Sequence, residues 1–143
     1  MKKIIMILML GFLLIIPGVV FGAGLTGGRH MIASETLVVS GATVTCNAID
    51  LKKNEYVGIW YKIDSGAGPD VKITYEMSYN TTSANFAEPE GASDIVTNLT
   101  DTDSHIESIP CPPMRYIRIK VYGNAGNGAD TKISIVLFVQ EQS

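Results

Sequence analysis

Alternation of apolar and polar residues is the main pattern of this chain beyond residue 35. It is clearest in four segments, 56–63, 71–79, 114–122 and 131–140. In the first of these, one face carries Val57, Ile59, Tyr61 and Ile63. Because successive side chains of a strand point to opposite faces, this period predicts half-buried β-strands.

Shorter stretches of the same kind predict four more strands, at 36–39, 43–51, 93–97 and 105–109. The connections are rich in Gly, Asn, Asp and Pro, which are typical turn residues. No window of ten or more residues carries a helical apolar stripe. About eight strands without helices predict an all-β fold, a two-sheet antiparallel β-sandwich of jelly-roll-like type.

The N-terminus has the composition of a bacterial-type export signal. Lys2 and Lys3 precede an uncharged apolar run over 4–21, and small residues follow. We expect cleavage after Gly22, with an uncleaved signal anchor as the alternative. The predicted organisation is therefore a signal peptide over 1–22, a flexible arm over 23–34 and a β-sandwich domain over 35–143. The exported protein is then extracellular or at the cell surface.

The charge of the exported part argues against nucleic-acid binding. Removing residues 1–22 takes away two lysines and leaves nine Lys and Arg against fourteen Asp and Glu, a formal charge of −5. Phosphate neutralisation needs clustered lysine and arginine, so we expect no nucleic-acid partner. About 120 residues fit a single hydrophobic core, with no membrane span after cleavage.

The chain contains two cysteines, Cys46 and Cys111. Oxidising compartments preserve disulfides, and an even count in a small exported domain favours an internal bridge between the two. The alternative is an intermolecular disulfide that links subunits.

Several stretches of the chain carry a resemblance to known modules. The run Arg115-Tyr116-Ile117-Arg118-Ile119, together with 71–80 and Asn85-Phe86, resembles late strands of discoidin-type, galactose-binding-like jelly rolls. With Ala92-Ser93-Asp94-Ile95-Val96 and Pro112-Pro113, the same strand is also similar to short β-sandwich modules of phage virion structural proteins. The resemblance spans about residues 36–140 and implies a fold and a binding or structural class, with no binding residues carried over.

Four aromatic residues fall on the second faces of their strands and are candidate ligand or interface residues. They are Tyr56, Trp60, Tyr122 and Phe138. Aromatic rings on a sheet surface stack on sugars or become buried at protein interfaces. The alternative is that both faces of these strands are covered within the domain.

Metal and catalytic signals are weak. Asp94, Asp101 and Asp103 supply hard oxygen ligands and are weak calcium candidates, although aspartates in polar turns usually cap the turn backbone. His105 is the histidine on which a hydrolase site would depend, and no G-x-S-x-G motif occurs. We therefore expect no catalysis and no cofactor.

These patterns favour a non-enzymatic extracellular structural protein that assembles with copies of itself or attaches to a surface structure. A flexible arm could pair with the sheet edge of a neighbouring subunit or of another extracellular protein. The first alternative is a carbohydrate-binding module that holds a glycan through Trp60, Tyr56 or the loop near Asp101. The weaker alternative is a secreted hydrolase.

Overall fold

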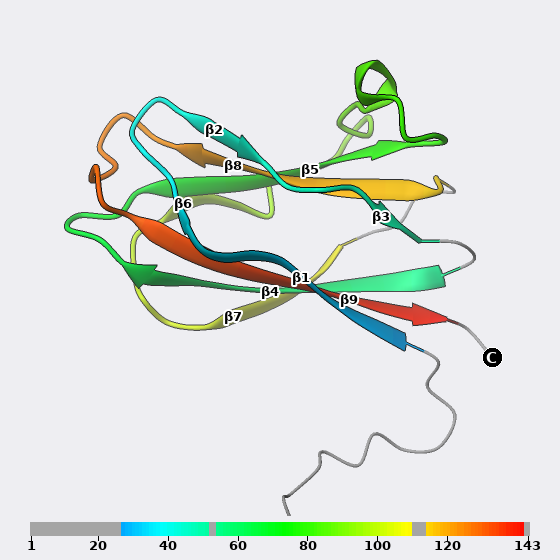
Figure 1. Ribbon diagram of the computed structural model, residues 1–143, viewed down its shortest axis with the longest axis horizontal. Coiled ribbons are helices and arrows are strands. Elements are labelled where there is room, and N and C mark those ends of the chain that lie inside the picture. Colours follow the sequence, from blue (N-terminus) through cyan, green and yellow to red (C-terminus); the bar gives the residue numbers. More distant parts are fainter. Residues whose placement is uncertain (1–26, 52–53, 110–113, 142–143) are drawn as a thin grey trace, which may run out of the picture.

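The computed structural model describes residues 27–51, 54–109 and 114–141. Within them the chain forms nine strands and one short 3-10 turn, η1 (Figure 1). The elements are β1 (Gly27–Leu37), β2 (Thr43–Thr45), β3 (Ile49–Asp50), β4 (Asn54–Ser65), β5 (Val71–Ser78), η1 (Ser83–Asn85), β6 (Val96–Leu99), β7 (His105–Ile109), β8 (Tyr116–Gly123) and β9 (Lys132–Glu141). No helix in these ranges is long and apolar enough to cross a membrane.

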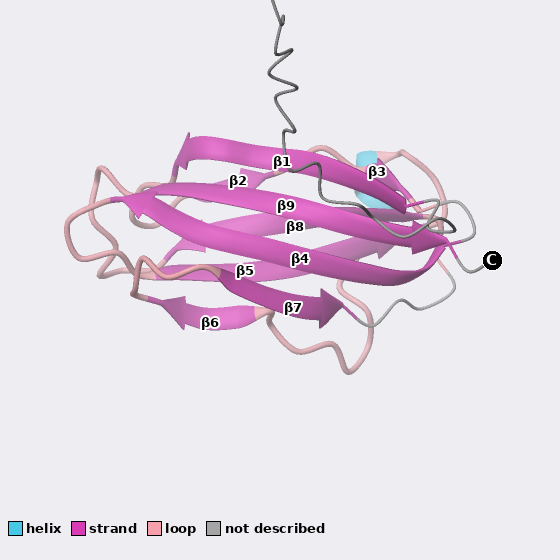
Figure 2. Cartoon of the chain, turned by 90° about the horizontal axis from the view of Figure 1, so that it is seen from below, coloured by secondary structure: helices cyan, strands magenta, loops and turns pink. Residues whose placement is uncertain are grey.

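The strands form two layers. Sheet A has the order β1-β9-β4-β7, and sheet B has the order β2-β8-β5-β6, with β3 also paired to β8. All of the paired strands are antiparallel. Figure 2 shows the four strands of sheet A side by side in front of the strands of sheet B. The predicted all-β, two-sheet, jelly-roll-like sandwich is confirmed.

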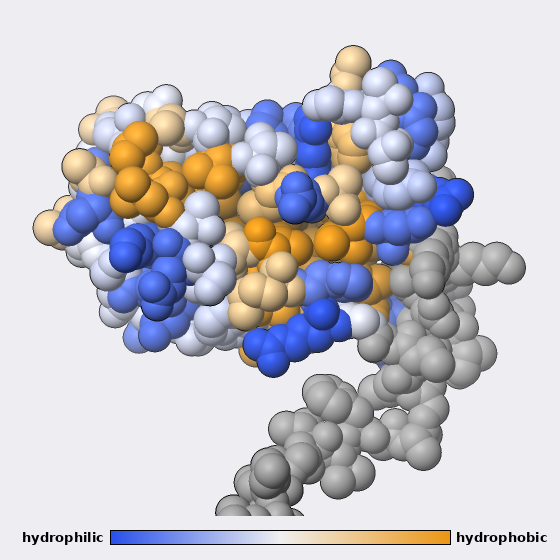
Figure 3. Space-filling view, in the orientation of Figure 1, coloured by the Kyte–Doolittle hydropathy of each residue, from blue (hydrophilic) through white to orange (hydrophobic). Residues whose placement is uncertain are grey.

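The core lies between the two sheets and follows the predicted alternation. Sheet A contributes Val57, Ile59, Tyr61, Ile63, Ile133, Ile135, Leu137 and Val139, all at most 3% exposed. Sheet B contributes Val71, Ile73, Tyr75, Met77, Ile117, Ile119 and Val121. Figure 3 shows hydrophobic surface across the middle of the molecule, where β1 faces β2 and β3 across the rim of the sandwich.

The expected flexible arm is wrong from residue 27 onward. Gly27 pairs with Gln140 and the ladder between β1 and β9 continues to Leu37 opposite Lys132, so this segment is an edge strand of sheet A. The glycine-rich start of β1 lacks apolar periodicity, so the sequence pattern did not predict a strand there. The strand forms through its backbone ladder to β9. The predicted signal peptide, 1–22, and residues 23–26 lie outside the described residues.

The expected strand over 43–51 is divided into β2 and β3. Thr45 lies opposite Lys120 and Ile49 opposite Ile117, so three residues of this segment face two of β8. One extra residue makes a β-bulge, and the amide of Cys46 donates to the carbonyl of Ile119 within it (2.9 Å). This division accounts for nine strands where about eight were expected, since β1 includes the start of the strand expected at 36–39.

The outer face of β5 is buried, although its polar residues predicted a solvated face. Thr74, Glu76 and Ser78 are 3%, 8% and 1% exposed. The connection from β5 to β6 lies against this side, because Ala87 pairs with the backbone of Met77 and Phe86 stacks under the Arg118 guanidinium, 4.3 Å from the ring centre. Tyr79, in phase with the core residues of β5, lies just past the end of the strand and is 67% exposed.

The buried charge of Glu76 is neutralised by two cations from β8. Its carboxylate accepts from Arg118 Nε (2.6 Å) and from Lys120 Nζ (3.0 Å). Burial pushes the pKa of Glu76 upward, but the hydrogen bonds and charges of Lys120 and Arg118 outweigh this, so the pKa lies below its usual range. A carboxyl whose pKa is lowered by folding stabilises the fold above its ordinary pKa, and this contribution is lost as the pH falls through the folded-state pKa.

The substitution Glu76→Gln tests this contribution. Removing one partner of a buried ion pair leaves Arg118 and Lys120 uncompensated, so we expect the free energy of unfolding at pH 7 to fall by about 2–4 kcal/mol. Urea unfolding at pH 7 and at pH 3 would measure it, with the exposed Glu90→Gln as the matched control. Wild type should lose more stability on acidification than Glu76→Gln; equal losses in both proteins would contradict the account.

Candidate functional site

Three of the four candidate aromatic residues share the outer face of sheet A, the face turned to the viewer in Figure 2. Tyr56 and Trp60 alternate on β4 with the buried core residues, and Phe138 on β9 lies opposite Gly58. Tyr56 is 61% exposed, Phe138 is 38% exposed and Trp60 is half-buried. In Figure 2 no described segment crosses in front of this face of sheet A.

The strand register extends this group into an apolar row that crosses all four strands of sheet A. Met31 on β1 lies opposite Val136 on β9, Val136 lies opposite Trp60 on β4, and Trp60 lies opposite Ile106 on β7. Side chains at directly opposed positions of an antiparallel pair have Cβ atoms about 5 Å apart, so these four form a continuous line. We call them the apolar row.

Exposure along the apolar row rises from the middle to the edges. Val136, on a central strand, is 1% exposed, whereas Met31 is 55% and Ile106 is 75% exposed. Met31 lies on edge strand β1 and Ile106 on edge strand β7, and neither edge strand has an outer neighbour in the described chain. The row is thus covered in the middle and open at both ends.

Tyr122, the fourth aromatic candidate, lies on the other sheet. It is on β8 opposite Thr43 and Lys72, and its ring lies beneath two ammonium groups, Lys72 Nζ at 5.7 Å and Lys120 Nζ at 5.2 Å from the ring centre. These cation–π contacts give Tyr122 a role within sheet B. It cannot act together with Tyr56, Trp60 and Phe138 in one flat contact.

The weak calcium candidates do not form one ligand group. Asp94 is paired with Lys72 (3.1 Å), and Asp101 Oδ1 accepts from the backbone amide of Asp103 (2.9 Å) and contacts His105 Nε2 (2.8 Å). The described ranges contain no group of three or more His, Cys, Asp or Glu residues placed to hold a metal ion. Asp101 therefore caps its own turn.

The His105 ring lies between an acid and an aromatic residue at the start of β7. It stacks on Tyr61 with 5.2 Å between ring centres, and the contact with His105 lowers the pKa of Asp101. Tyr61 donates its hydroxyl to Glu107 Oε1 (2.6 Å); burial, followed by this carboxylate, raises the Tyr61 pKa. In the described chain, His105 thus contacts Asp101 through Nε2 and Tyr61 through its ring face.

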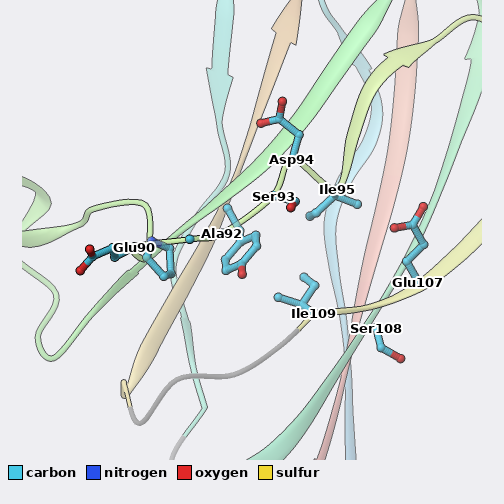
Figure 4. A pocket seen from close by; sticks show the side chains of 11 residues that line it. Glu90, Ala92, Ser93, Asp94, Ile95, Glu107, Ser108 and Ile109 are labelled. Atoms are coloured by element: carbon cyan, nitrogen blue, oxygen red, sulfur yellow. The ribbon is translucent and has the colours of Figure 1, made fainter.

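A groove of about 460 Å³ lies between β7 and the segment that precedes β6 (Figure 4). Its lining includes Tyr75, Ile95 and Ile109, with the carboxylates of Glu90 and Glu107 among its polar groups. The groove runs beside the last three residues of β7, 107–109. The groove could not be predicted from the sequence, because residues 89–95 and β7 are brought together only when the chain folds.

Cys46 is buried at 8% exposure, and burial raises its pKa to about 11. Its thiol is free in the structure, and the expected partner Cys111 lies outside the described residues. The bridge between them is not seen and stays a prediction.

Sequence reasoning also missed Met31 and Ile106, the exposed ends of the apolar row. Met31 was placed in the expected arm. In the sequence, Ile106 is a single apolar residue on the face of its strand that does not carry Ile109. A single such residue carries little signal until the strand order places Trp60 beside it.

No protein-family model matches the chain, and no curated protein matches it. Among solved structures, the chain is similar to one described as "Bacillus endospore appendages form a novel family of disulfide-linked pili", with 12% identity, a TM-score of 0.47, and coverage of 83% of this chain and 91% of that chain. It is also similar to one described as "Crystal Structure of FLHE", with 11% identity, a TM-score of 0.43, and coverage of 82% and 98%. Similarities at this level do not establish a shared function.

Proposed function

We propose that this protein is an exported, non-enzymatic structural subunit that assembles with copies of itself through sheet A. The observation that carries the proposal is the apolar row, whose ends at Met31 and Ile106 are 55% and 75% exposed on the two edge strands of sheet A. With Tyr56 and Phe138, which are also exposed, these ends give the outer face of sheet A several exposed apolar side chains, and exposed apolar patches are a feature of interaction surfaces.

The size of the face supports this role. Its three longest strands, β1, β9 and β4, contain 11, 10 and 12 residues. With a rise of about 3.3 Å per residue and a spacing of about 4.8 Å between strands, these three strands cover about 36 Å by about 14 Å, and the shorter β7 brings the sheet to about 600 Å². A standard interface buries about 800 Å² per partner, so sheet A with its edges could supply most of one.

The two sheets differ in a way that supports the same proposal. The outer side of sheet B is engaged by its own chain through Phe86, Ser83 and the ion pairs of Glu76. The outer side of sheet A has no such cover among the described residues, and its centre is aromatic and aliphatic. A copy of the same chain would remove this surface from water.

The substitution Ile106→Asp tests the proposal. We expect wild type to form large assemblies in sedimentation and electron microscopy, and Ile106→Asp to weaken association by about tenfold or more, because burial of such a side chain is worth about 1.5–3 kcal/mol. Ile106 lies outside the core, so the monomer should stay folded.

The matched control is Thr45→Asp, an exposed position on β2 of the opposite sheet. It should assemble like wild type. A wild-type protein that stays monomeric at high concentration, with no particles in the microscope, would refute the proposal.

The second candidate function is carbohydrate binding, favoured by the presence of Tyr56, Trp60 and Phe138 on one face. Sugar rings stack on exposed aromatic rings, and the two strands hold these three in fixed positions.

A glycan array separates the two functions. If the face binds sugar, specific glycans should bind to wild type and be lost in Trp60→Ala, while Tyr122→Ala on sheet B keeps them. Absence of any bound glycan, with and without calcium, would rule this candidate out.

A further inference from the structure

The two free edges of sheet A run in opposite directions. Each neighbouring pair in the order β1-β9-β4-β7 is antiparallel, so β1 is antiparallel to β7. If a second copy is placed beside the first in the same orientation, its β1 arrives antiparallel to β7. The antiparallel sheet could therefore continue from copy to copy through a head-to-tail contact.

The two edges also match in length. β7 contains five residues, His105–Ile109. β1 keeps a regular register over five residues, from Gly27 to Met31, before register shifts between Met31 and Ala33 and between Ala33 and Thr36. Because bulges disturb the ladder and protect an edge, only the first part of β1 presents a regular backbone edge.

One register between β7 and β1 of the next copy continues the cross-strand rows of sheet A, and in this register the opposed side chains are complementary. In that register Ile106 lies opposite Met31 of the next copy, which joins the two exposed ends of the apolar row on the outer face. On the inner face, Glu107 lies opposite His30 of the next copy, because these residues belong to the row of Leu137 and Ile59. A carboxylate then faces an imidazole across the strands, a favourable pair when the ring is protonated.

We propose that residues 106–109 of β7 in one copy pair antiparallel with residues 28–31 of β1 in the next, with Ile106 beside Met31 and Glu107 beside His30. This inference rests on the proposed function and specifies one contact of the assembly, between the two edges of sheet A. It explains why the most exposed residues of the apolar row lie at its two edges.

The groove beside β7 is consistent with an incoming strand. It lies along 107–109 and contains Glu107 in its lining, so the described chain leaves space next to this half of the strand. An inward-facing side chain at position 30 of the next copy could enter the groove near the Glu107 carboxylate. In a strand addition, backbone hydrogen bonds supply affinity and such side-chain contacts set the register.

Mixing two singly substituted proteins tests this arrangement. Ile106→Cys and Met31→Cys are prepared separately, mixed, assembled and oxidised mildly. Opposed positions of neighbouring strands bring Cβ atoms to about 4.5–5.5 Å, close to the separation of a disulfide. We expect a covalent dimer that contains one copy of each variant, identified by mass spectrometry of the linked peptides.

The controls address two alternatives: disulfides formed by the chain's own cysteines, and a two-fold contact in which the same edge of both copies meets. Oxidised wild type gives the background of Cys46 and Cys111, and a Lys72→Cys variant on sheet B mixed with Met31→Cys should give no new dimer. Oxidised assemblies without the link between 31 and 106, or Ile106→Cys linked to itself as in a two-fold contact, would overturn the inference while the proposed function stands. An absence of assemblies in wild type would instead defeat the proposed function.

An exchange of the charges at positions 107 and 30 tests the same register without cysteines, in case a cysteine variant does not assemble. Glu107→Lys should reduce assembly, and the double variant Glu107→Lys with His30→Asp should restore it, because the opposed charges are exchanged. No recovery in the double variant would count against the register. Circular dichroism of each variant checks that the monomer is folded.

Discussion

Burial of one face of each sheet against the other is the interaction on which the structure depends. Alternate residues of β4 and β9 enter the core at 3% exposure or less, so the intervening residues must point away from it. On sheet B the chain engages these outward residues itself, through Phe86 and the ion pairs of Glu76. On sheet A the described chain supplies no comparable cover. The alternation that makes the core therefore also creates the exposed apolar row.

The long strands and their inner faces could be predicted from the sequence, because β5 and β8 alternate strictly and β4 and β9 keep an apolar residue at every second position. β1 could not, since Gly27 and Gly28 carry no pattern and the strand depends on the ladder to β9. Nor could the burial of Glu76 be predicted, because its partners lie on β8, 42 and 44 residues away. Alternation shows which residues share a strand face, whereas cover from another segment depends on the fold.

The same limit applies to the candidate site. Tyr56, Trp60 and Phe138 were predicted to face outward because each lies out of phase with the core residues of its strand, and the structure places them on one face. Separating them from Tyr122 required the strand order, which places β8 in the other sheet. Met31 and Ile106 could not be recognised as candidates without the strand register. Each is a single apolar residue on an edge strand, and only the register places them in one row with Val136 and Trp60.

An assembly through sheet A has a direct physical signature at its free edges. Backbone amides of an unpaired edge exchange with solvent, whereas amides paired to a neighbouring strand are protected. Hydrogen–deuterium exchange of assembled and dispersed protein, read over 105–109 and 27–31, would measure this. The account predicts that both segments become protected on assembly while the edge strand β2 does not. Equal exchange of these segments in the two states would contradict it.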